Sequence, residues 1–212
     1  MDLPKQNNYE TAFSLAFDTL RQSDLPQRCA QAGVQYDQQA QVIQIPYLHR
    51  LCLIEASTGH FRWECDKQEV PLRDRILILH YLNRASGSKL SGRLISFAEV
   101  PAGQHYLPAF RKRSVDIILH AFGDRPEDLP RAESVLGGRE AEYGDISVTL
   151  YALPRIPITL VLWRGDDEFE SSANVLFDAT ISEYLPTEDI AVLTGTVAIR
   201  LYKERDKLSQ SS

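Results

Sequence analysis

The spacing of apolar residues predicts two helices at the start of the chain. Apolar side chains recur at three- and four-residue intervals, at Tyr9, Phe13, Ala16, Phe17 and Leu20. This period places them on one face of a helix. The pair Ser23-Asp24 can cap a second short helix that ends at Gly33. We expect both helices to pack against a sheet.

A different period follows from Val34 to Cys65, where apolar and polar residues alternate as they do in strands. The turns between the strands carry Asp37, Pro46 and Thr58-Gly59. The pattern predicts a β-meander. Its strands are expected at residues 34–36, 42–45, 49–56 and 61–65.

The second half of the chain mixes amphipathic helices with strands that are apolar on both faces. Pro71 can begin a deeply buried helix that runs toward Gly87 and is apolar on nearly every side except at His80. Runs that are apolar on both faces are typical of central strands. The remaining elements are expected at 93–97, 146–153 and 156–163 for strands, and at 106–122, 126–136 and 188–203 for helices.

This order of elements predicts an α+β fold, in which helices pack against a mostly antiparallel sheet. We expect a single domain over residues 1–204 and a disordered tail over residues 205–212.

The charge balance bears on the partners of the protein. The chain has 23 Lys and Arg against 29 Asp and Glu, a net charge of -6. Such a chain repels nucleic acid and anionic membranes at long range, so we expect neither as a partner. The N-terminus lacks a basic leader followed by an apolar run, which predicts a cytoplasmic protein. The basic run Arg111-Lys112-Arg113 is interpreted first as a solvated helix face.

An acidic turn is the most distinct local feature. Asp166, Asp167 and Glu168 follow Gly165 directly after the apolar run that ends at Trp163. We expect at least one of these acids to face a pocket, where carboxylates can bind a hard cation or exchange protons. The alternative is a polar turn without chemistry. No calcium-loop spacing is present, and no metal site is predicted.

The other polar residue types offer few assembled motifs. No two histidines lie three or four residues apart, and no Cys-x-x-Cys pair exists for zinc or an iron–sulfur cluster. His80, inside the apolar helix, is either a site residue or a core histidine bonded to a neighbour. Nucleophile-elbow, phosphate-loop and dinucleotide fingerprints are absent from the sequence.

Hairpin register gives an expectation for two cysteines. If Thr58-Gly59 form a two-residue turn, Ile54 lies opposite Trp63 and Cys52 opposite Cys65, all on one apolar face. A three-residue loop would instead place Ile54 against Arg62. We favour the first register and expect two packed thiols in a reducing cytoplasm.

Several blocks together resemble a bacterial family known as domain of unknown function three-seven-eight-six. The blocks are residues 77–82, 90–97, Tyr106 with 109–111, 153–157, 162–169 and 176–178. The resemblance spans roughly Tyr9 to Tyr202. It implies an occurrence largely in anaerobic bacteria and, from relatives with a cysteine-rich segment, a redox or corrinoid context. This chain has no such segment.

Three functions stay open, and the sequence identifies no cofactor and does not decide whether the protein is an enzyme. The first is a small-molecule or cofactor binding or accessory protein, whose pocket would use aromatic walls and a charged rim. The second is an enzyme that uses Asp166, Glu168 and Asp178 for acid–base or divalent-metal chemistry, with His80. The third is a purely structural subunit of a protein complex, for which a contiguous exposed apolar patch would be the sign. The candidate ligand-binding residues are Tyr106, Arg111, Trp163, Arg164, Asp166, Glu168, Phe169, Asp178 and His80.

One pairing is also expected across these candidates. Arg111 or Arg113 should form an ion pair with the acidic turn or with Asp178, because the planar guanidinium suits a carboxylate.

Overall fold

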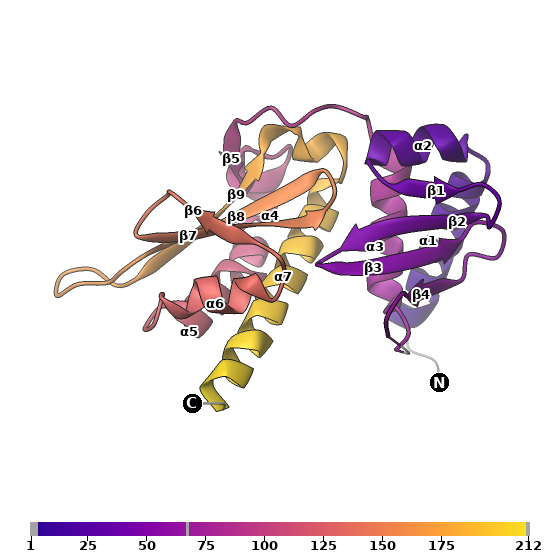
Figure 1. Cartoon of the computed structure of the whole chain (residues 1–212). Helices are drawn as coiled ribbons and strands as arrows, with labels where there is room; N and C mark the ends of the chain where they lie inside the picture. Colours follow the sequence, from indigo (N-terminus) through magenta and orange to yellow (C-terminus); the bar gives the residue numbers. More distant parts are fainter. Residues whose placement is uncertain (1–3, 67, 211–212) are drawn as a thin grey trace. The chain divides into compact units, whose positions relative to one another are not determined.

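The computed structural model describes residues 4–66 and 68–210, and it divides into two compact units. The N-terminal unit comprises Met1–Lys89, Leu153–Arg155 and Glu183–Leu185, and the C-terminal unit comprises Leu90–Ala152, Ile156–Ser182 and Pro186–Ser212. Each unit has its own sheet, shown with its helices in Figure 1. The predicted α+β fold with antiparallel pairing is confirmed. The single domain expected over residues 1–204 stays a prediction.

The sheet of the N-terminal unit is the predicted meander. Its strands β1 (Gln35–Asp37), β2 (Val42–Tyr47), β3 (Arg50–Glu55) and β4 (Phe61–Trp63) lie in chain order. Pro46 does not end β2, although the sequence suggests a turn there. Because β1 pairs only with Val42–Gln44, the missing N–H of Pro46 removes no hydrogen bond on that side.

The expected Cys52–Cys65 pairing is wrong. Cys52 lies opposite Trp63, and Ile54 lies opposite Phe61. The hairpin loop is longer than expected, because Glu55 N–H donates to the carbonyl of His60 and Gly59 takes a left-handed φ of 71°. Cys65 falls beyond the end of β4 and is exposed.

The helices of the N-terminal unit are α1 (Pro4–Arg21), α2 (Leu25–Ala32) and α3 (Leu72–Arg84). The predicted caps of α2 are confirmed: the Asp24 carboxylate accepts the N–H of Gln27 at 2.9 Å, and Gly33 adopts φ 69°. Besides Asp74, the buried residues of α3 run from Ile76 to Leu82, interrupted only by His80, which is half-buried. The predicted buried helix is confirmed, and it packs beside α1.

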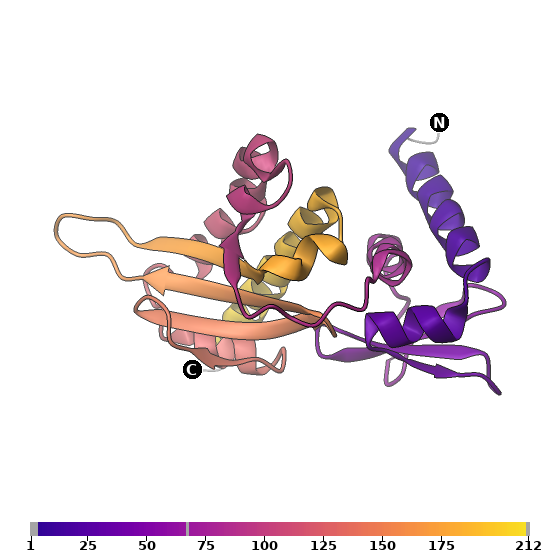
Figure 2. The ribbon, with the colours of Figure 1, turned by 90° about the horizontal axis from the view of Figure 1, so that it is seen from above.

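The C-terminal unit contains a sheet in the order β5-β9-β8-β7-β6. Its long strands β7 (Ile146–Leu153), β8 (Ile156–Trp163) and β9 (Ser172–Asp178) are the inner ones, and β5 (Leu94–Ser96) and β6 (Arg139–Ala141) are short edges. The predicted central strands are thereby confirmed. In Figure 2 the connection between β8 and β9 extends beyond the rest of this sheet.

Helices cover the C-terminal sheet. They are η1 (Phe97–Glu99), α4 (Gly103–Arg113), α5 (Val115–Phe122), α6 (Asp128–Ser134), η2 (Ala179–Glu183) and α7 (Thr187–Gln210). Stacked rings of Phe97 and Phe110, 3.9 Å apart, join α4 to the sheet residue Phe177 in one core. The part of the chain expected as a tail is helical as far as Gln210. None of the helices described here is both long and apolar enough to span a bilayer.

The single helix expected over 106–122 is divided at Ser114. This residue is fully buried, has φ −135°, and its hydroxyl donates to the carbonyl of Phe110. A serine hydroxyl that bonds to the preceding turn competes with the helical pattern. The break separates α4 from α5 and sets the direction of α5 independently.

Candidate functional site

The acidic turn follows directly on the central strand β8, as the sequence predicts. All side chains from Arg164 to Glu170 are exposed. The Asp166 carboxylate accepts the backbone N–H groups of Glu168 at 2.9 Å and Phe169 at 2.8 Å. These hydrogen bonds lower the pKa of Asp166, so that it is ionised and holds the turn together.

Arg164 anchors the base of this turn. Its guanidinium lies 3.2 Å from the carboxylate of Glu127, and its backbone N–H donates to Asp145 at 2.8 Å. Both side chains of the ion pair are more than half exposed, so the pair contributes little to stability. Asp166, Asp167 and Glu168 are all exposed, and none of them lines the hollow described below. The expectation that one of them faces a pocket stays a prediction.

Asp178, the last residue of β9, has the environment of a residue that stabilises the fold. It is 4% exposed. Its carboxylate accepts the N–H and hydroxyl of Ser91 (3.1 and 3.0 Å), the N–H of Gly92 (2.7 Å), and the N–H and hydroxyl of Thr180 (3.0 and 2.7 Å). Burial alone would raise its pKa, but the hydrogen bonds from Thr180, Ser91 and Gly92 outweigh burial and lower it to about 2. A carboxylate held in this way does not exchange protons near neutral pH.

The acids proposed for catalysis do not form one cluster. The seven residues of β9 separate the acidic turn from Asp178. At roughly 3.3 Å per residue, an extended strand of this length spans about 20 Å. The arrangement therefore removes Asp178 as a partner for Asp166 or Glu168 in acid–base chemistry.

The aromatic candidates lie on the surface. Tyr106 is 45% exposed, Trp163 40% and Phe169 70%. Trp163 is close to Gly144, where an added Cβ would lie 3.1 Å from the indole. None of the three lines the hollow described below.

The predicted ion pair of Arg111 or Arg113 is wrong for the described residues. Both arginines are exposed in the last turn of α4. The acceptors of Asp178 are filled by Ser91, Gly92 and Thr180. The basic run is a solvated helix face, which agrees with its first interpretation.

His80 lies on α3, in the N-terminal unit, whereas the other candidate residues belong to the C-terminal unit. It is half-buried and interacts with a neighbouring group. This environment agrees with a core histidine. Over residues 4–66 and 68–210, no three His, Cys, Asp or Glu side chains are grouped to hold a metal ion.

The three cysteines are free thiols with different exposure. Burial raises the pKa of Cys29 to about 11 and that of Cys52 to about 12, whereas Cys65 is exposed. Because the thiolate is the reactive form, we expect a thiol reagent to modify Cys65 alone in the native protein and all three in urea. Titration with a chromogenic disulfide measures this, and rapid native reaction of a Cys65→Ser variant would contradict it.

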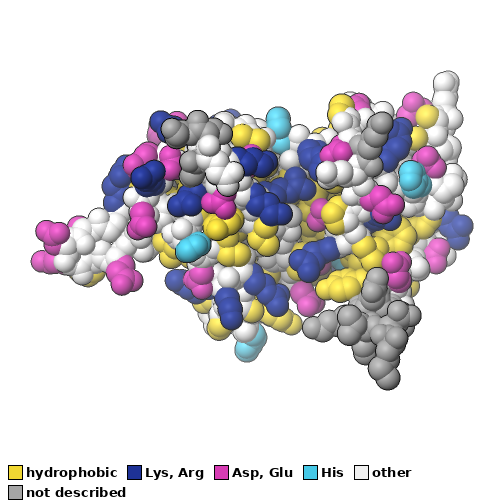
Figure 3. All heavy atoms as spheres, turned by 90° about the horizontal axis from the view of Figure 1, so that it is seen from below, with side chains coloured by type: hydrophobic (Ala, Val, Ile, Leu, Met, Phe, Trp, Pro, Cys, Tyr) yellow, Lys and Arg dark blue, Asp and Glu magenta, His cyan; other side chains and the backbone are white. Residues whose placement is uncertain are grey.

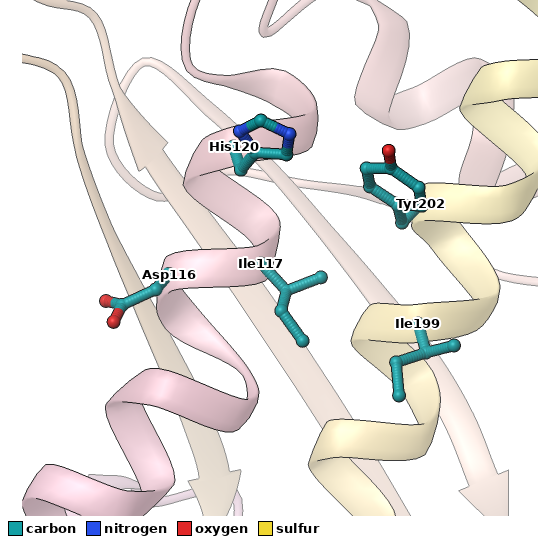
Figure 4. A pocket seen from close by; sticks show the side chains of 5 residues that line it. All are labelled: Asp116, Ile117, His120, Ile199 and Tyr202. Atoms are coloured by element: carbon teal, nitrogen blue, oxygen red, sulfur yellow. The ribbon is translucent and has the colours of Figure 1, made fainter.

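A shallow apolar hollow lies on the surface between α5 and α7. It has a volume of about 350 Å³ and is lined by Asp116, Ile117, His120, Ile199 and Tyr202. Figure 4 shows the side chains of Ile117 and Ile199 between the two helices, with His120 and Tyr202 toward one end and Asp116 directed away from α7. The rings of His120 and Tyr202 are stacked, with centroids 5.9 Å apart and 14° between their planes.

Two contacts of α7, one with the end of α4 and one with α5, explain where the hollow forms. Before it, Gly195 allows a close approach, since an added Cβ would lie 3.2 Å from the carbonyl oxygen of Arg113. After it, His120 stacks on Tyr202. Between these levels the two isoleucines leave open space, and Ile199 is 43% exposed.

The surroundings of the hollow carry positive charge. Lys203 is exposed and lies one turn of α7 after Ile199. Arg113, also exposed, ends α4 with its backbone against Gly195, which lies one turn of α7 before Ile199. Asp116 is the acid at the rim. In Figure 3, apolar side chains gather on this face of the C-terminal unit with Lys and Arg side chains around them.

The sequence did not identify the two isoleucines of the hollow, Ile117 and Ile199, as site residues. The expected apolar stripe of α7 comprises Ile190, Leu193, Val197 and Leu201, all buried. Ile199 lies off that stripe, and Ile117 lies off the buried face of α5. An apolar residue on the polar side of an amphipathic helix is the signal that was available.

Fold and site together define an α+β protein with an apolar surface hollow between two helices. The chain belongs to the family described as Domain of unknown function (DUF3786), which it matches over residues 24–200. The matched range includes Ile117, His120 and Ile199 and ends just before Tyr202. The family resemblance expected from the sequence is confirmed. No curated protein and no solved structure matches the chain.

Proposed function

We propose that the protein is a cytoplasmic binding or accessory protein that docks a partner protein through the α5–α7 hollow. The observation that supports this most is the pair Ile117 and Ile199, which lie between the two helices at the surface with Ile199 43% exposed. Surface pockets that accept one apolar side chain are common centres of protein interfaces.

The form of the hollow favours a protein over a small molecule. Small-molecule sites enclose most of the ligand and orient it with several converging polar groups. Here the hollow is open, its floor is made of Ile117 and Ile199, and Asp116 is directed away from α7. A single apolar side chain, held in place by a larger interface around it, satisfies this geometry better.

The charges around the hollow favour an acidic partner segment. Arg113 and Lys203 are exposed near it. Complementary charge increases the association rate and selects the partner. The net charge of -6 over the whole chain repels nucleic acid, so a protein is the better match for this local positive surface.

A peptide experiment tests the proposal. The probe is a capped pentapeptide, Glu-Asp-Phe-Asp-Glu, titrated into the ¹⁵N-labelled protein. We expect amide shifts centred on Ile117, His120, Ile199 and Tyr202, and binding at least about tenfold weaker in an Ile199→Glu variant, since the anchor position dominates such contacts.

Two peptides and one variant serve as controls. Replacing Phe by Ser in the peptide removes the anchor, and replacing the acids by Lys reverses the charge; both changes should weaken binding. Leu208→Glu alters another exposed apolar residue of α7 and should leave binding unchanged. Equal binding of all three peptides, or shifts centred away from α5 and α7, would refute the proposal.

A further inference from the structure

We infer that a second copy of this chain is a partner for the hollow, and that the inserted side chain is Phe169 of the acidic turn. This inference rests on the proposed function, because it identifies the occupant of the same site. It would make the protein self-associate through a turn on one copy and two helices on another.

Phe169 is the natural candidate for insertion because nothing on its own chain covers it. It is 70% exposed, as high as any large apolar side chain of the described residues. The turn that presents it is already ordered, since the Asp166 carboxylate accepts the N–H of Phe169 and the Asp166 N–H donates to the Phe169 carbonyl at 2.9 Å. A preorganised turn loses little conformational entropy on binding.

The charges of the turn complement those of the hollow. Asp166, Asp167, Glu168 and Glu170 surround Phe169 in the sequence and are all exposed. The exposed cations near the hollow are Arg113, whose backbone lies against Gly195 of α7, and Lys203, one turn of α7 after Ile199. Figure 3 shows acidic side chains on the protruding turn of the C-terminal unit, and others scattered over the rest of this face.

The two surfaces lie on different elements of one chain, so the contact joins unlike patches. Such a contact can be made twice in a closed dimer or repeated from copy to copy. In either arrangement each molecule supplies one turn and one hollow, and this property can be tested with two variants that each lack one of them.

Sedimentation velocity measures the association over a range of concentrations. We expect the wild-type protein to show concentration-dependent association that weakens with added salt, because exposed charges are screened. Phe169→Ser removes the inserted ring, and Ile199→Glu blocks the hollow. Each variant alone should associate at least about tenfold more weakly than the wild type.

The decisive sample is an equimolar mixture of the two variants. Phe169→Ser retains a hollow and Ile199→Glu retains a turn, so the mixture should form a one-to-one heterodimer that neither variant forms alone. Tyr143→Ser, at another exposed aromatic residue of the same unit, should associate like the wild type. Circular dichroism verifies that each variant is folded.

Two results would overturn the inference: a wild-type protein that is monomeric at every concentration, or a mixture that remains monomeric. If either occurs while the acidic Phe peptide still binds at Ile199, the docking function stands and the partner is another protein. If the peptide also fails to bind, both proposals are wrong.

Discussion

An Asp178→Ala variant should lose about 4 kcal/mol of unfolding free energy at pH 7. Removing the carboxylate leaves the buried donors of Ser91, Gly92 and Thr180 without their acceptor, and each unsatisfied group costs about 1–3 kcal/mol before the site relaxes. Asp178→Asn should cost about half as much, because the amide oxygen replaces only one of the two carboxylate oxygens. Urea unfolding followed by circular dichroism gives both values.

The pKa of Asp178 adds a pH dependence to this prediction. The folded pKa is lowered from 3.8 to about 2. The stabilisation is therefore complete above pH 3.8 and is lost as the pH falls toward about 2, a change of about 2 kcal/mol. Asp167→Asn, on the exposed turn, is the matched control and should change stability by less than about 0.5 kcal/mol. Equal effects of the Asn variants at 167 and 178 would show that the buried hydrogen bonds contribute nothing.

The helices and strands could be predicted because their buried faces require apolar residues at regular intervals in the sequence. The apolar runs at 146–153 and 156–163 became inner strands, and Asp24 and Gly33 capped α2, since each depends on local chemistry alone. The break at Ser114 does not interrupt this periodic pattern and so cannot be recognised from it. The hydroxyl of this serine adds a second hydrogen bond to the Phe110 carbonyl, which also accepts the Ser114 N–H, inside a stretch without glycine or proline to mark the break.

The hairpin between β3 and β4 shows a limit of apolar patterning. The expected register and the observed one differ by two residues, and a shift of two keeps every side chain on the same face of the sheet. Ile54 and Trp63 are therefore buried in both, and the pattern cannot separate them. Loop geometry decides, through the left-handed conformation of Gly59.

The candidate site could be predicted less well than the fold. The sequence correctly placed Asp166, Asp167, Glu168 and Phe169 after β8, but a cluster requires convergence of distant segments. The partners of Asp178 come from Ser91 and Gly92, far away in sequence, and they convert a candidate acid into a structural anchor. The hollow likewise depends on how α5 crosses α7, which Ile117 and Ile199 do not specify individually.

A second large effect is expected at Glu133, a carboxyl group buried in the C-terminal unit. It is 1% exposed, and its Oε1 has no hydrogen-bond partner among the described residues. The carboxyl group occupies the space beside Gly138, where any Cβ would overlap it. Burial raises its pKa from 4.5 to about 7, since an unpaired charge is unfavourable away from water.

This raised pKa makes the protein less stable as the pH increases. Between pH 4.5 and about 7 the folded state retains a proton that the unfolded state has released, so unfolding free energy falls by about 3 kcal/mol across that interval and is constant above it. The interval does not overlap that of Asp178, whose effect is confined to lower pH. The summed pH dependence of Asp178 and Glu133 therefore predicts that the unfolding free energy is largest near pH 4 to 5.

A Glu133→Gln variant isolates the effect. The neutral amide has nearly the same shape, so the variant should show little change in stability between pH 5 and 8 and should be more stable than the wild type at pH 8. Glu140→Gln, on the exposed edge strand β6, removes a carboxylate without burial and should follow the wild-type pH profile. Urea unfolding across this pH range measures all three proteins. A wild-type stability that does not fall between pH 5 and 7, or a Glu133→Gln substitution that leaves the slope unchanged, would show that Glu133 is ionised at little cost and that solvent reaches it in the folded protein.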